Sequence, residues 1–235
     1  MLASAFEAAK TSDHEARQLE QALRGAGDPA LLLRALELRL GRGDLDGAAR
    51  AGVLAEMADV LAGPLGRHDE ALVALLGALE HDPASTALLQ RSIASARAAG
   101  HEAVVRCADA IARFAASADE AGRGPVAAAL FYALGVLSER DLADPARALA
   151  AFTRAEALGA DPIPVWRAID RVAAAAGDSA AQIRVLRHLV FAGDAGDPAA
   201  LTEDIYRLAG LELSSPDDIA AGLATIDWAM GREIR

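Results

Sequence analysis

The 235-residue chain is poor in several residue types, and each scarcity excludes a class of protein. Cys107 is its single cysteine, so an internal disulfide cannot form and nothing implies an oxidising compartment. Aromatic residues make up only 4% of a chain that is 53% hydrophobic, so its core has to be built from alanine and leucine. These two residues favour helices, whereas the residues that favour strands are sparse. The composition therefore predicts an all-α protein.

Long apolar runs and clusters of basic residues are also missing. The longest stretch without a charged residue, 124–138, is too short to cross a bilayer. The amino-terminal residues lack the basic start and apolar run of a signal peptide. The net charge of −11 creates an acidic surface that repels phosphate backbones. We therefore expect a cytoplasmic protein that binds neither membranes nor nucleic acid.

Motifs that carry chemistry are absent as well. None of the five histidines has metal-ligand spacing, and neither a phosphate-binding glycine loop nor a nucleophile elbow occurs. The carboxylates fall at expected helix starts and on solvent faces, where the helix dipole and water favour them. We expect no catalytic residue, no metal and no cofactor, and we expect Cys107 to be a small buried residue.

Signals for helix starts are abundant. An Asp or Ser side chain can accept a hydrogen bond from a free backbone N–H, and proline fits the first helical position. Six dipeptides have this form: Asp28-Pro29, Asp82-Pro83, Asp144-Pro145, Asp161-Pro162, Asp197-Pro198 and Ser215-Pro216. Apolar stripes at helical spacing include Leu72, Leu75, Leu76 and Leu79, and also Ile219, Leu223, Ile226 and Met230. Helices are predicted at 13–25, 28–41, 45–62, 67–81, 84–98, 101–116, 122–140, 144–158, 162–176, 178–191, 198–212 and 215–230. The short connections between them pair neighbouring helices antiparallel.

The helical pattern repeats along the chain. Ala71, Leu75 and Ala78 are matched 77 residues later by Ala148, Phe152 and Ala155. A third copy lies 74 residues further on, where Tyr206, Leu223, Ile226 and Ala229 match Tyr132, Leu149, Phe152 and Ala155. A repeat of this kind cannot bury its apolar face alone, so neighbouring copies are expected to stack.

These residues resemble the tetratricopeptide repeat family. That family places a small residue early in the second helix of each pair, a large apolar residue four positions later, another small residue three positions after that, and then a proline. The matching residues are Ala71, Leu75, Ala78 and Pro83; Ala148, Phe152, Ala155 and Pro162, with two extra residues before the proline; and Leu134-Gly135 in the first helix. Segment 84–116 is a shorter copy, with Ala103, Cys107 and Ala110 in the second-helix positions.

The resemblance covers roughly residues 45–235 and implies an αα-hairpin solenoid with a right-handed superhelical path. We expect residues 1–43 to form a helical segment that caps the array, and residues 44–235 to form one continuous repeat domain. A generic array of helical hairpins is the alternative.

The resemblance also implies a place for a partner, because the first helices of the pairs line a concave groove in the family. The matching groove positions are Tyr132, Val136, Glu139 and Arg140, with Tyr206 in the third copy and Trp166, Arg167 and Arg171 on the intervening first helix. Tyrosine, tryptophan and arginine are favoured at binding hot spots. The alternative interpretation is that Trp166 is packed in the core and the arginines are solvated charges.

The carboxy-terminal end suggests another role. Trp228, Met230 and Ile234 occur where a further helix would cover them, so they predict either a longer array or a homo-oligomer. The expected function is therefore a non-enzymatic interaction or scaffold module that holds a peptide or protein segment. Structural self-assembly is the alternative, and an enzyme or small-ligand sensor on a helical scaffold is the third hypothesis.

Overall fold

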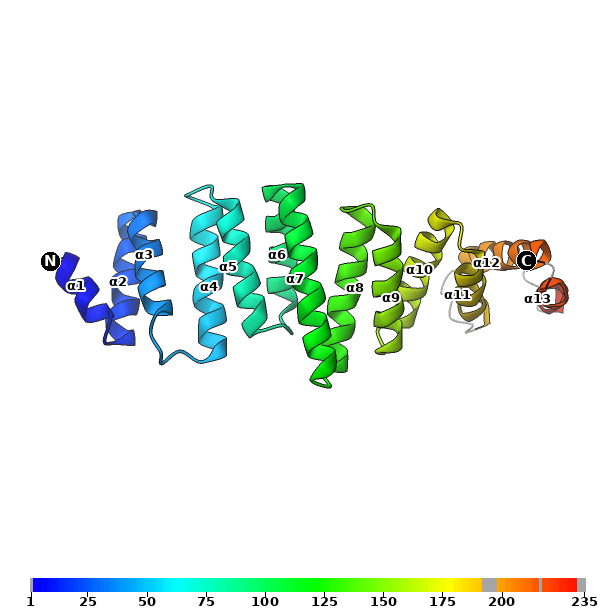
Figure 1. The fold of residues 1–235 in the computed structure, drawn as a ribbon, viewed down its shortest axis with the longest axis horizontal. Helices are drawn as coiled ribbons and strands as arrows, with labels where there is room; N and C mark the ends of the chain where they lie inside the picture. Colours follow the sequence, from blue (N-terminus) through cyan, green and yellow to red (C-terminus); the bar gives the residue numbers. More distant parts are fainter. Residues whose placement is uncertain (1, 192–197, 216, 232–235) are drawn as a thin grey trace. The chain divides into compact units, whose positions relative to one another are not determined.

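The computed structural model describes residues 2–191, 198–215 and 217–231, and these residues form helices and no strand (Figure 1). The first helices are α1 (Leu2–Ala9), α2 (Asp13–Ala26), α3 (Pro29–Leu40), α4 (Gly47–Ala62), α5 (His68–His81), α6 (Thr86–Ala99) and α7 (His101–Glu120). They are followed by α8 (Gly124–Arg140), α9 (Pro145–Ala157), α10 (Pro162–Ala176), α11 (Ser179–Phe191), α12 (Pro198–Ser214) and α13 (Ile219–Gly231). The prediction of an all-α protein is confirmed.

The chain divides into two compact units, residues 1–121 and 122–235. In the first unit, α1 packs against α2 and α3, and the hairpins α2–α3, α4–α5 and α6–α7 follow one another. In the second unit, the hairpins α8–α9, α10–α11 and α12–α13 do the same. Within each unit every helix packs against the next, which confirms an array of helical hairpins. The right-handed superhelical path and the domain boundary at residues 43 and 44 stay predictions.

Side-chain caps explain several of the helix starts. Asp28 Oδ1 accepts from the backbone N–H of Leu31 at 3.0 Å, and Asp144 Oδ1 accepts from that of Arg147 at 2.9 Å. In both cases a proline follows in the first helical turn, where its missing N–H leaves no hydrogen bond unmade. These two dipeptides act as the sequence predicts.

Other dipeptides behave differently. Asp82-Pro83 does not start a helix: Asp82 follows the end of α5, and Ser85 caps α6 by accepting from Leu88 N–H. Asp161 occupies the cap position of α10 without a side-chain capping bond. The helix expected from residue 215 begins at Ile219, and Ser215 donates its hydroxyl hydrogen to Asp218. Residues 197 and 216, which complete two of the dipeptides, lie outside the described residues.

Small residues bring the helices of a pair together, as the repeat pattern predicts. Ala71, Ala78, Ala148 and Ala155 are fully buried. The closest approach is at Gly135 in α8, where an added Cβ would lie only 2.5 Å from Cε1 of Phe152 in α9. Phe152 is itself fully buried, in a cluster that includes Val165 and Ile169 of α10. The absence of a side chain at Gly135 therefore makes room for the largest residue of this core.

Cys107 occupies a similarly buried position in the first unit. Its side chain is fully buried in α7, and burial raises the pKa of the Cys107 thiol to about 12. The expectation of a small buried residue is confirmed.

Candidate partner-binding surface

Three ion pairs connect the first helices of the second unit. Arg171 of α10 donates from Nε and Nη2 to the two carboxylate oxygens of Glu139 in α8, at 2.5 and 2.8 Å. On its other side, α10 pairs with α12 through Arg167 Nη1 to Asp204 Oδ1 at 2.6 Å. Two further bonds of 2.8 Å join Arg207 of α12 to Asp170. Charged side chains thus hold α8, α10 and α12 together along one series of helices.

The electrostatics of these pairs follow from their bonds. The hydrogen bond from Arg171 lowers the pKa of Glu139 below its usual value, and burial opposes this shift only in part. The same bond raises the pKa of the Arg171 guanidinium, and Tyr132 of α8 is near enough to add to that effect. Glu139, Arg171 and Tyr132, three of the predicted site residues, are therefore neighbours.

An apolar hollow of about 440 Å³ opens beside Tyr132. It lies between α8 and the start of α10, and its lining includes Pro125, Ala128, Ala129, Tyr132, Pro164 and Val165. The Tyr132 ring packs against Phe152 with 5.6 Å between ring centroids, and Val136 packs against the same core cluster. Both residues are partly buried, so one side of the tyrosine is fixed by the core while the other lines the hollow.

Arg140 and Trp166 occupy different surroundings. Arg140 is exposed at the last position of α8, and its charge also lowers the pKa of the adjacent Glu139. Trp166 of α10 instead stacks on His188 of α11 at 4.9 Å and donates from Nε1 to Glu156 of α9. The structure therefore does not bring Trp166 together with Arg167 and Arg171, which contact α12 and α8.

Glu156 anchors the Trp166 cluster. Burial raises the pKa of Glu156, but the hydrogen bonds from Arg184 and Trp166 outweigh burial and leave the pKa below its usual value. Arg184 Nη1 lies 2.9 Å from both carboxylate oxygens. This cluster ties α9, α10 and α11 to one another and has the character of a structural contact.

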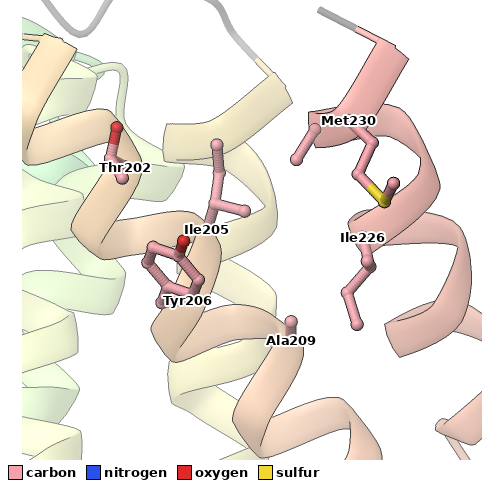
Figure 2. A pocket seen from close by; sticks show the side chains of 7 residues that line it. Thr202, Ile205, Tyr206, Ala209, Ile226 and Met230 are labelled. Atoms are coloured by element: carbon pink, nitrogen blue, oxygen red, sulfur yellow. The ribbon is translucent and has the colours of Figure 1, made fainter. Parts of the chain in front are cut away.

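A second hollow, of about 200 Å³, lies between α12 and α13 (Figure 2). Tyr206, the match of Tyr132, lines it from α12 and is 75% exposed. Ile226 and Met230 of α13 line the opposite wall, and Met230 is 74% exposed. Trp228 is partly buried and meets the Phe191 ring edge-on at 5.0 Å, whereas Ile234 lies outside the described residues.

The buried acidic partners of the arginines are not among the residues predicted from the sequence. Asp170, Asp204 and Glu212 are buried, and each binds an arginine of a neighbouring helix. The sequence spacing between paired charges could have indicated these partners, because oppositely charged residues that pair between helices recur 32 or 37 residues apart. The pairs 32 apart are Arg24–Glu56, Asp59–Arg91 and Glu139–Arg171, and those 37 apart are Asp69–Arg106, Arg167–Asp204 and Asp170–Arg207.

The part of the chain that the structure describes contains no group of three or more His, Cys, Asp or Glu side chains placed to hold a metal ion. Among the same residues, no helix combines the length and the apolar composition needed to span a bilayer.

Comparison with known proteins gives one kind of match. No protein-family model matches the chain, and no curated protein matches it in sequence. A crystal structure of a tetratricopeptide repeat protein from Parabacteroides merdae is similar, with a TM-score of 0.44 and 13% sequence identity. The match covers 97% of this chain and 80% of that protein. The similarity is to a protein of the family that the sequence pattern resembles.

Proposed function

We propose that this chain is a non-enzymatic protein-interaction module that binds a peptide or protein segment on the first helices of its second unit. The observation that carries the proposal is the apolar hollow beside Tyr132, framed by helices that ion pairs hold in place. Arrays of helical hairpins present extended surfaces of this kind, and such surfaces are used for binding. A site that is already formed lowers the ordering cost of association.

The chemistry of the surface indicates the kind of segment that would bind. The hollow would accept an apolar side chain, because alanine, proline and valine line most of its wall. Arg171, near Tyr132, is half exposed but already paired with Glu139, and Asp161 is the one charged residue among the described residues that line the hollow. A segment with an apolar anchor fits this arrangement, since buried apolar anchors supply most of the affinity of an interface.

The test is to fill the hollow without disturbing the core. Ala129 is exposed at its rim, so Ala129→Trp should place an indole in the hollow and leave α8 folded. Ala150→Trp puts the same side chain on an exposed position of α9 and is the matched control. Proteins captured from a lysate of the source organism are then quantified by mass spectrometry for both variants and the wild type.

We expect wild type and Ala150→Trp to retain the same partner, and Ala129→Trp to lose at least about tenfold of it, as loss of a hot-spot contact predicts. A double variant, Tyr132→Ala with Arg171→Ala, should lose the partner as well. Full capture by Ala129→Trp with unchanged helicity would rule out this hollow as the binding site.

A second candidate function is self-assembly. Six large apolar side chains are exposed in the last three helices: Phe191, Tyr206, Leu213, Ile219, Leu223 and Met230. Contiguous exposed apolar surface marks interaction sites in folded proteins. This observation supports the carboxy-terminal end as a contact between copies of the chain.

A further inference from the structure

The last helix carries a stripe of large apolar residues that is largely exposed. Ile219, Leu223, Ile226 and Met230 follow one another at intervals of four, three and four residues, so they form one stripe along α13. Ile219, Leu223 and Met230 are 46%, 56% and 74% exposed, and Ile226 is partly buried. The stripe is therefore largely exposed, with Ile226 and Met230 bordering the hollow toward α12, although its spacing is that of a buried helix face.

Contacts on the inner side hold α13 in this orientation. Thr225 Oγ1 donates to Glu212 Oε2 at 2.8 Å, and Arg187 of α11 donates to Glu212 Oε1 at 2.7 Å. At Gly222 an added Cβ would lie 3.0 Å from the Leu213 side chain, so α12 and α13 approach closely there. Rotating α13 to bury its stripe would break the Thr225–Glu212 bond and leave the buried carboxylate of Glu212 with fewer partners, which is costly.

The spacing of the stripe indicates that the partner that covers it is another helix. Alternating intervals of three and four residues form the seam of two-stranded helix pairs, in which each side chain enters a hole of the facing helix. Ala220 is exposed beside the stripe, and its small side chain would permit close approach of a second backbone. A helix that pairs with the stripe needs the same spacing of apolar residues. The stripe of α13 has this spacing, so two copies of α13 can pair with each other.

Charge selects the direction of the pair. Asp217 and Asp218 precede α13, and Asp227 lies on the helix beside the stripe. A parallel pair would bring the acidic starts of the two helices together, whereas an antiparallel pair sets each acidic start beside the carboxy-terminal end of the partner helix. Opposed helix dipoles favour the antiparallel direction as well.

We propose that the chain forms a two-fold symmetric homodimer through antiparallel pairing of α13 with α13 of a second copy, with Ile219 facing Met230 and Leu223 facing Ile226 across the axis. The proposal rests on the second candidate function and names its partner and geometry. The hollow between α12 and α13 lies beside the stripe, so Tyr206 would border the contact (Figure 2).

The first experiment measures mass against concentration. The stripe spans three to four helical turns, so we expect a weak dimer that forms between about 1 and about 200 µM, as small interfaces do. Analytical ultracentrifugation of the wild type should show this transition. Leu223→Glu and Met230→Glu should remain monomeric over the whole range, and Val73→Glu, which changes an exposed apolar residue of α5, should dimerise like the wild type.

The second experiment tests direction. Chains carrying Ile219→Cys and chains carrying Met230→Cys are mixed and oxidised, with Cys107 left in place because it is buried. Antiparallel pairing predicts a mixed disulfide in several-fold excess over either single-variant disulfide. A monomer at every concentration would remove both the dimer and the self-assembly function. A dimer that survives Leu223→Glu would overturn the stripe as the contact, and preferential bonding between identical positions would overturn the direction.

Discussion

Arginine supplies nearly all the positive charge of this chain, because Lys10 is its only lysine. The planar guanidinium can donate two parallel hydrogen bonds to one carboxylate, which the compact ammonium of lysine cannot do. Arg171 binds Glu139 in this way, and Arg207 binds Asp170 in this way. A pair of this kind therefore restrains the orientation of the two helices as well as the distance between them.

The Glu139–Arg171 pair should make stability depend on pH. The pKa of Glu139 is lowered in the folded chain, so its contribution is present above the unfolded pKa and is lost as the pH falls through the folded pKa. Glu139→Gln should cost about 0.2–1 kcal/mol at pH 7, because Arg171 is half exposed and the pair is screened by solvent. Urea denaturation at pH 7 and at pH 3 measures the difference.

The difference between wild type and Glu139→Gln should shrink at the lower pH. Glu80→Gln removes an exposed carboxylate from α5 and controls for the loss of one negative charge. An equal cost of Glu139→Gln at both pH values would show that the ionised pair contributes nothing.

The residues of the candidate site were only partly predictable. The repeat pattern assigns Tyr132 and Tyr206 equivalent positions, and each lines a hollow, but the pattern says nothing about which carboxylate an arginine binds. In the sequence, Asp204 and Asp170 look like ordinary charges on a helix surface. Only the packing of the neighbouring helix shows that they are buried and paired. Trp166 shows the same limit, because a tryptophan on a first helix can face either neighbour, and here it faces α9 and α11.

At the scale of helices, Gly135 decides how closely α8 and α9 pack. Gly135→Ala would drive a methyl group into the Phe152 ring, so we expect a loss of about 1–3 kcal/mol in the free energy of unfolding. Gly210→Ala in α12 is the matched control, since no atom lies within 4 Å of the added Cβ. The free energy of unfolding of that control should rise by about 0.5–1 kcal/mol, because alanine favours a helix more than glycine does.

A second substitution distinguishes the packing explanation from any other. The matching positions of the last hairpin hold Ala209 and Ile226, a larger residue with a smaller one. Gly135→Ala combined with Phe152→Ile copies that combination and should recover part of the lost stability in urea denaturation. If the double variant is less stable than the sum of the single changes predicts, the ring contact is not the cause.

The positions of the helices were more predictable than their end residues or the exposure of their apolar side chains. The apolar period located α2 to α13, because burial of one helix face leaves a mark every three to four residues. The short helix α1 was missed, since two turns carry too little of that period. The stripe of α13 has the period but is largely exposed, because the hydrogen bond of Thr225 and the close approach at Gly222 set the face that α13 turns to α12.

At the scale of the whole molecule, the division into two units predicts independent folding. Residues 122–235 contain three hairpins that pack among themselves, so this fragment should show helical circular dichroism and a cooperative urea transition. A fragment of residues 141–235 lacks α8 and exposes Phe152, so it should be less stable and less cooperative. An unfolded 122–235 fragment would show that the second unit depends on the first.

The cross-helix ion pairs give the hairpins a fixed order. Helix α10 offers Arg171 to the hairpin before it, and Asp170 and Arg167 to the hairpin after it. A hairpin duplicated, deleted or moved by recombination would arrive with charges meant for other neighbours. A hairpin in a new place therefore keeps these ion pairs only if both members of a pair change at each new junction.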